Sequence, residues 1–189
     1  MKREISDRNM LDNFAVDFCK IMEKHAKYII VSGFVAISSG RARGTEDIDM
    51  IIKKLNFGAF KKLHEDLIKN NFVCMQSDDA NEIYSYLKEN LSVRYTRKNM
   101  PLPEMEIKFA KDKLDEMQLK KRIKLEFTGL NIWFGSVNMN IAFKEEYLKS
   151  DKDMEDARHL RIVYSDIIEE KEIGKFKKMV RILRLKNEG

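Results

Sequence analysis

Apolar residues recur through most of this chain at the spacing of an amphipathic helix or of a strand. The first helical pattern has Ser6 or Asp7 available as an N-cap. Short apolar runs that end at turn-forming residues indicate strands between the helices. The patterns predict strands at 28–32, 47–53, 72–75, 91–96, 104–110, 123–127 and 131–134, and helices at 6–27, 33–39, 56–70, 77–87, 112–122, 136–149, 151–164 and 165–186.

The order of these elements predicts an α+β protein with a mixed β-sheet. Strands and helices alternate through residues 1–135, whereas residues 136–189 read as helices only. We expect residues 1–135 to form a core flanked by helices, and residues 136–189 to pack on that core within one structural domain. The strands at 91–96 and 104–110 are expected to be antiparallel and joined by a loop that contains both prolines.

The composition is that of a folded protein without membrane-spanning segments. Hydrophobic residues make up 43% and charged residues 35% of the 189 residues, which separates the chain from the disordered class. No stretch approaches the roughly 18 consecutive apolar residues that span a bilayer, and no apolar signal core follows the N-terminus. Cys19 and Cys74 lack the spacing of a disulfide framework or a zinc site. We therefore expect a cytoplasmic protein with no membrane partner.

The chain carries a small excess of positive charge, with a formal net charge of +5. This excess is compatible with a polyanionic partner such as RNA or a nucleoside triphosphate, although a lysine-rich solvated surface gives the same value. Basic residues are interleaved with apolar ones in the last predicted helix. That pattern fits a solvated helix face better than an RNA-binding one.

Two carboxylates stand close together in the strand predicted at 47–53. Because side chains alternate along a strand, Asp47 and Asp49 project from one face and Ile48 and Met50 from the other. Two acids that leave a buried strand together repel each other and resist ionisation unless a cation lies between them. The pair therefore favours a divalent-metal site.

Phosphoryl chemistry at such a pair usually requires a third carboxylate. The strand at 104–110 places Glu104, Glu106 and Lys108 on one face. We favour Glu106, because it lies between apolar neighbours where an acid is costly unless it has a function. The same three residues would simply face solvent if this were an edge strand. Upstream of the acid pair, Gly33 can begin a short helix whose backbone N–H groups face a phosphate.

In this order and spacing, the residues resemble the DNA polymerase β-like nucleotidyltransferase superfamily, particularly its small prokaryotic members. Some of those proteins are toxins of toxin–antitoxin and abortive-infection systems. The shared pattern is an apolar strand, a Gly-Gly or Gly-Ser turn, a short helix that ends in glycine, and Arg-x-Thr-x-Asp-ϕ-Asp. The matching residues are Ser32, Gly33, Gly40, Arg43, Thr45, Asp47, Ile48 and Asp49, within a resemblance that spans residues 28–160.

The resemblance implies an enzyme that uses Mg²⁺ or Mn²⁺ to transfer an NMP from an NTP to a hydroxyl acceptor. By the same resemblance, Asp47, Asp49 and Glu106 coordinate two metal ions, and Glu106 accepts the proton of the acceptor. Lys144 is implied to hold the triphosphate, and Lys152 begins a Lys-Asp-x-x-Asp segment that closes these domains. The residues implied to bind the nucleotide are Ser32, Gly33, Arg43, Thr45, Lys144, Lys152 and Asp153.

The chain departs from the family pattern at two positions. Phe34 follows Gly33 where a hydroxyl residue is usual, and Glu106 replaces the more common Asp. These changes keep a second interpretation open, in which a catalytically silent module of this type binds RNA or a partner protein. A phosphohydrolase with Asp47 as nucleophile is disfavoured, because Met-Ile follows the acid pair and no cap insertion is evident. The acceptor, whether RNA such as tRNA, a protein or a small molecule, stays open, as does an antitoxin partner.

Overall fold

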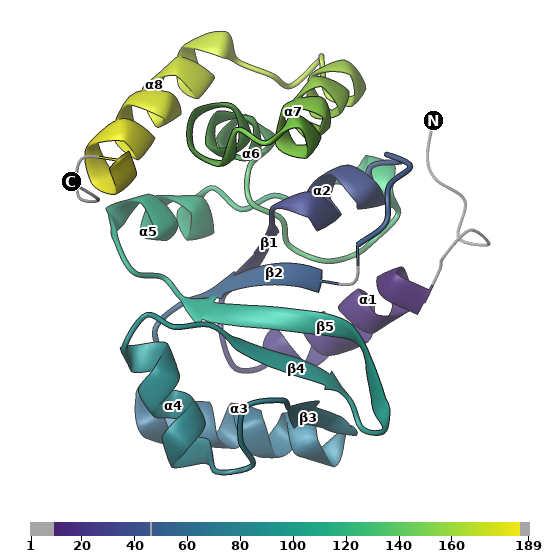
Figure 1. Ribbon diagram of the computed structural model, residues 1–189, viewed down its shortest axis with the longest axis vertical. Helices are drawn as coiled ribbons and strands as arrows, with labels where there is room; N and C mark the ends of the chain where they lie inside the picture. Colours follow the sequence, from purple (N-terminus) through teal and green to yellow (C-terminus); the bar gives the residue numbers. More distant parts are fainter. Residues whose placement is uncertain (1–9, 46, 186–189) are drawn as a thin grey trace.

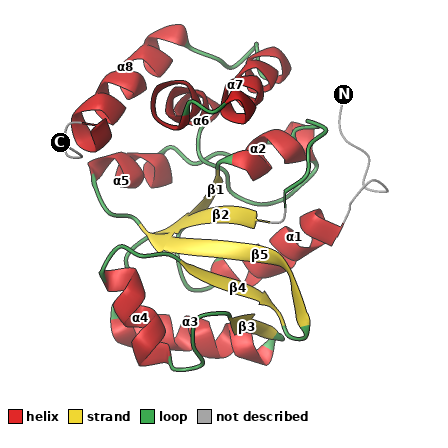
Figure 2. Cartoon of the chain, viewed as in Figure 1, coloured by secondary structure: helices red, strands yellow, loops and turns green. Residues whose placement is uncertain are grey.

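A mixed five-stranded β-sheet forms the centre of the molecule (Figures 1 and 2). The computed structural model describes residues 10–45 and 47–185. The strands lie in the order β1-β2-β5-β4-β3, and neighbours are antiparallel except for β2 and β5, which are parallel. The strands are β1 Tyr28–Val31, β2 Asp47–Ile52, β3 Phe72–Cys74, β4 Val93–Arg97 and β5 Met100–Phe109.

Helices cover both faces of this sheet (Figure 1). Helices α1, α3 and α4 pack on one side, while α2 and α5 contact β1 and β2 on the other, with α6, α7 and α8 stacked beyond them. None of the helices in the described part of the chain is long and apolar enough to cross a bilayer. The helices are α1 Met10–Met22, α2 Gly33–Ser38, α3 Phe57–Lys69, α4 Ala80–Lys88, α5 Lys113–Lys120, α6 Val137–Phe143, α7 Asp151–Val163 and α8 Glu170–Val180.

Alternation along the central strands separates an apolar face from an acidic one. Ile48 and Met50 are fully buried against the helices on the α1 side. Asp47, Asp49 and Glu106 lie on the opposite face and keep part of their surface exposed. The two-residue period therefore places the acids together, as the sequence predicts.

The predicted mixed-sheet α+β fold is confirmed, and the chain beyond residue 135 is helical as far as it is described. The last helix differs in its start, since α8 begins at Glu170 after turns at 164–167. Helix α6 continues into a π-helical turn, Lys144–Leu148, and α8 into another, Arg181–Leu185. The predicted N-cap candidates Ser6 and Asp7 and the predicted helix end at Lys186 lie outside the described residues.

Both prolines lie inside β5 rather than in a loop, which corrects the prediction. Strand β2 pairs with β5 only over residues 104–109. Pro101 and Pro103 therefore remove no hydrogen-bond donor from the ladder with β2. The register of β5 with β4 also shifts near these residues, between Tyr95 and Arg97.

The strands predicted at 123–127 and 131–134 are not formed. Phe134 makes isolated bridges to Ile30 and Ile123, and Glu126–Thr128 is a 3₁₀ turn. Neighbouring apolar residues are buried all the same, among them Leu125 and Ile132. The apolar pattern in this stretch thus reports burial against the core and not pairing in the sheet.

Candidate active site

Most of the residues that the sequence singles out line one cleft of about 630 Å³. The cleft lies between the acidic face of the sheet, the turn from β1 to α2, the loop before β2 and the start of α7. Ser150 and Asp151 also line it, although the sequence did not point to them. The predicted residues in the cleft are Ser32, Gly33, Arg43, Thr45, Asp47, Asp49, Glu106, Lys152 and Asp153.

The acid pair and the third acid meet through the parallel pairing of β2 with β5. Asp49 is the direct register partner of Glu106, and Asp47 is the partner of Glu104. Neighbouring strands lie about 4.8 Å apart, so the two carboxyl groups start from adjacent backbone positions. Burial raises the pKa of Asp49, and the nearby charge of Glu106 raises it further. The fold therefore holds a concentration of negative charge at this point.

Glu106, and not Glu104, lines the cleft, but both are paired with Arg94 of β4. Arg94 Nη2 lies 2.7 Å from Glu106 Oε2, and Arg94 Nε lies 3.2 Å from Glu104 Oε2. In these positions, no three Asp, Glu, His or Cys side chains of residues 10–45 and 47–185 group closely enough to hold a metal ion. Arg94 therefore competes with any cation for the Glu106 carboxylate.

The charges in the cleft nevertheless fit divalent cations. Its described lining holds two cations, Arg43 and Lys152, against five carboxylates: Asp47, Asp49, Glu106, Asp151 and Asp153. Such a lining would repel a bare triphosphate, and it suits a nucleotide that enters together with positive ions. Mg²⁺ and Mn²⁺ take oxygen ligands of this kind, and a cation at Asp49 would offset the burial and the charge of Glu106 that raise its pKa.

The turn into α2 is built closely around Arg43. Ser32 has φ 66° and ψ −138°, and Gly33 begins the helix. A Cβ at residue 33 would lie 2.0 Å from Arg43 Nη2, so only glycine lets the guanidinium reach the first turn of α2. Phe34 is fully buried in the core, so the hydroxyl usual at this position has no substitute there. The start of α2 is thus lined by a cation and by backbone donors.

Arg43 is held in place by a buried carboxylate on α7. Asp156 is fully buried and lies 3.4 Å from Arg43 Nε, 2.9 Å from Arg41 Nε and 2.8 Å from Lys144 Nζ. This cluster fastens the loop before β2 to the C-terminal helices. The Lys-Asp-x-x-Asp pattern in the sequence contains Asp156, although it did not predict the cluster.

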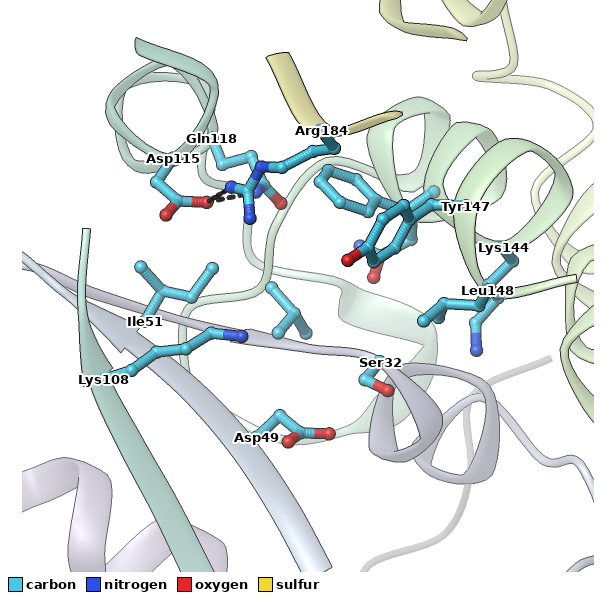
Figure 3. A pocket seen from close by; sticks show the side chains of 13 residues that line it. Ser32, Asp49, Ile51, Lys108, Asp115, Gln118, Lys144, Tyr147, Leu148 and Arg184 are labelled. Atoms are coloured by element: carbon cyan, nitrogen blue, oxygen red, sulfur yellow. Dashed lines mark hydrogen bonds and ion pairs between the residues drawn. The ribbon is translucent and has the colours of Figure 1, made fainter. Parts of the chain in front are cut away.

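Lys144 is the one predicted site residue that does not line the cleft. Its side chain is 1% exposed and paired with Asp153 as well as Asp156. Lys144 instead lines an adjoining cavity of about 200 Å³ (Figure 3), which shares Ser32 and Asp49 with the cleft. Its contact with a triphosphate stays a prediction.

The sequence matches no protein-family model and no curated protein, whereas solved structures do resemble the fold. The antibiotic-resistance factor ANT(2'')-Ia is similar with a TM-score of 0.56 and 12% identity, over 94% of this chain and 95% of that one. A nucleotidyltransferase-like protein from Paracoccidioides brasiliensis is similar with a TM-score of 0.53 and 16% identity, over 94% and 90% of the two chains. The chain has a nucleotidyltransferase fold. The expected fold is thereby confirmed, while the small prokaryotic toxin type stays a prediction.

Within this nucleotidyltransferase fold, the turn before α2 is strained at Ser32. A non-glycine residue in that backbone conformation costs about 1–3 kcal/mol. We expect the free energy of unfolding of Ser32→Gly to exceed that of Ser32→Ala by about 1–2 kcal/mol. Both variants lose the hydroxyl, and only glycine relieves the strain. Equal stability of the two variants in urea denaturation would show that the turn is relaxed.

Three basic residues at the C-terminal end of the fold form ion pairs within the molecule, while Lys175 and Lys178 are exposed. Lys177 Nζ lies 2.6 Å from Glu145 Oε2, and Arg181 Nε lies 2.7 Å from Glu146 Oε1. Arg184 is buried and pairs with Asp112 and Asp115. These pairs anchor one side of the helix to the rest of the molecule, while the absence of an RNA-binding role stays a prediction.

Proposed function

We propose that this protein is a metal-dependent nucleotidyltransferase that transfers an NMP from an NTP to a hydroxyl acceptor. The observation that carries the proposal is the meeting of two features in one cleft. Asp49 and Glu106 are register partners on adjacent strands, and the turn that holds Gly33 against Arg43 lies beside them. The nucleotidyltransferase fold supports this reading of the cleft.

In the proposed reaction, the first turn of α2, Arg43 and Lys152 hold the terminal phosphates of the NTP. Backbone donors and fixed cations of this kind neutralise phosphate charge without reorganising during the reaction. The N-terminus of the longer helix α7, capped by Ser150, opens onto the same cleft and adds further unpaired N–H groups.

Asp47, Asp49 and Glu106 would hold two Mg²⁺ or Mn²⁺ ions, which when bound would stabilise charge on the entering oxygen and on the departing pyrophosphate. The acceptor hydroxyl attacks the α-phosphorus in line, a new P–O bond forms, and the bond to pyrophosphate breaks. Glu106 receives the proton of the hydroxyl once it has turned from Arg94. Arg94 remains paired with Glu104 and keeps the strand pair together.

The proposal is tested by incubating the protein with each α-³²P-labelled NTP, Mg²⁺ and either total tRNA or cell extract, beside an Asp49→Asn control. Label that moves to one class of molecule in the wild type alone would support the activity and identify the acceptor. If no NTP binds and no label moves, the proposal fails. Expression of both forms in cells would test a toxin role, since only the active form should arrest growth.

The ion pair of Glu106 with Arg94 and the buried Phe34 favour a second candidate, a catalytically silent module of the same fold. Such a module would bind NTP in the presence of Mg²⁺ and transfer nothing to any acceptor. The labelling experiment separates the two candidates when it is combined with a direct measurement of NTP binding.

A further inference from the structure

Lys108 is a cation on the acidic sheet face that the mechanism above does not use. It follows Glu106 by two residues on β5, so both side chains leave the same face, and its register partner is Ile51. Figure 3 shows the Lys108 side chain reaching into the cavity of about 200 Å³ that also contains Ser32 and Asp49. Lys108 therefore lies where this cavity meets the cleft.

The other cations of the cavity are already neutralised. Lys144 and Arg184 are each held by two carboxylates. Among residues 10–45 and 47–185, Lys108 has no carboxylate as an ion-pair partner, and its charge acts at longer range on Asp49. Lys108 is partly buried as a residue, and its charge has no direct partner among the described carboxylates. An anion that reaches Asp49 would meet this group.

The cations of the cleft and the cation of the cavity would face different phosphate groups of a bound nucleotide. Arg43 and Lys152 line the cleft beside Gly33, while Lys108 lines the cavity, and the two spaces meet at Asp49. A triphosphate whose terminal phosphates lie at Gly33 would extend its α-phosphoryl group toward Asp49, where the two spaces meet. Lys108 is the cation whose charge acts on Asp49, so that group would meet it there.

We propose that Lys108 binds the α-phosphoryl group of the nucleotide, an inference that rests on the proposed function. The alternative is a structural role, in which Lys108 merely offsets the charges of Asp49 and Glu106. The two roles differ in their ligand dependence. A contact to the α-phosphoryl group affects nucleoside monophosphates and not pyrophosphate, whereas a structural role affects both ligands alike.

Calorimetric titration tests the proposal without requiring turnover. The affinities of each nucleoside monophosphate and of pyrophosphate are measured in the presence of Mg²⁺. We expect Lys108→Met to weaken binding of the monophosphate by about tenfold, the loss typical of one charged hydrogen bond, and to leave pyrophosphate binding within about twofold. Arg43→Met should show the reverse selectivity. Lys108→Arg should recover most of the loss, and the exposed Lys62→Met on α3 should change neither affinity.

Melting temperatures accompany each titration, and Lys108→Gln replaces the methionine variant should that one not fold. If the wild type binds neither ligand and also fails to bind NTP with Mg²⁺, the proposed function itself fails. If the wild type binds both and the Lys108 variants weaken both equally or neither, the proposed contact is overturned and the proposed function stands. In the active enzyme, Lys108→Met should lower kcat/KM for NTP by about a hundredfold. About tenfold of this loss should appear as a higher KM, in step with the weaker monophosphate binding, and the rest as a lower kcat, because charge grows on this group in the transition state.

Discussion

Asp49→Asn is expected to abolish nucleotidyl transfer and at the same time to make the metal-free protein more stable. Burial and the charge of Glu106 raise the pKa of Asp49, so its ionised form is unfavourable in the fold. Asparagine keeps the shape and removes the charge. Without the carboxylate, the proposed metal site loses a ligand, and activity should fall by about a thousandfold or more.

The same variant should alter the dependence of stability on pH. Because the pKa of Asp49 is raised, the folded protein keeps this proton at a pH where the unfolded chain has lost it. The stability that Asp49 contributes is therefore greatest in acid, and it declines as the pH rises through the raised pKa of the folded state. The asparagine side chain does not titrate. The gain in the free energy of unfolding of Asp49→Asn over the wild type should therefore be small in acid and larger near neutrality.

Thermal melts in EDTA and in Mg²⁺, together with the labelling assay, check this prediction. Mg²⁺ should raise the melting temperature of the wild type more than that of Asp49→Asn, because binding to the native state stabilises it. The exposed Asp166→Asn serves as the matched control and should behave as the wild type does. Transfer activity that survives in Asp49→Asn would remove the basis of the proposed function.

Asp156→Ala is expected to have the largest effect on stability. The Asp156 carboxylate is fully buried among Arg41, Arg43 and Lys144, and its removal leaves three cations without this partner. Breaking a buried ion pair by removing one partner costs about 3–5 kcal/mol. Arg43 should also lose its fixed position against Gly33, so NTP binding should weaken in whatever fraction of the protein remains folded.

The neighbouring Glu155 provides a control that shares one partner. Glu155 Oε2 lies 2.6 Å from Arg41 Nη2, but its side chain is 60% exposed. An exposed ion pair contributes about 0–1 kcal/mol, so Glu155→Ala should be nearly neutral in urea denaturation. A similar loss of stability in both variants would show that burial does not set the strength of the Asp156 cluster.

Local patterns in the sequence pointed to most of the residues that line the candidate cleft. The two-residue period of β2 places Asp47 beside Asp49, and the same period in β5 separates Glu106 from its apolar neighbours. Glycine before a short apolar helix marks the turn at Gly33. Each of these signals depends on residues close together in the chain, where backbone geometry alone decides which way side chains point.

Contacts between distant segments were not predictable in the same way. Nothing in the pattern shows that Arg94 pairs with Glu106, because that contact depends on the register of β4 against β5. Lys144 looks like a surface lysine in sequence, yet the packing of α7 against the end of α6 buries it against Asp156. Ser150 and Asp151 enter the cleft only because α7 begins there. Tertiary packing, and not local preference, decides these positions.

The parallel pairing of β2 with β5 also affects how the protein is made. Residues 53–99 separate the two strands, and β5 must insert between β2 and β4. On the ribosome, Asp47 and Asp49 emerge well before Glu106, and domains are synthesised from the N-terminus onward. A nascent chain therefore carries the two aspartates without their third carboxylate. The complete acidic site cannot form until β5 has emerged and has paired with β2 and β4.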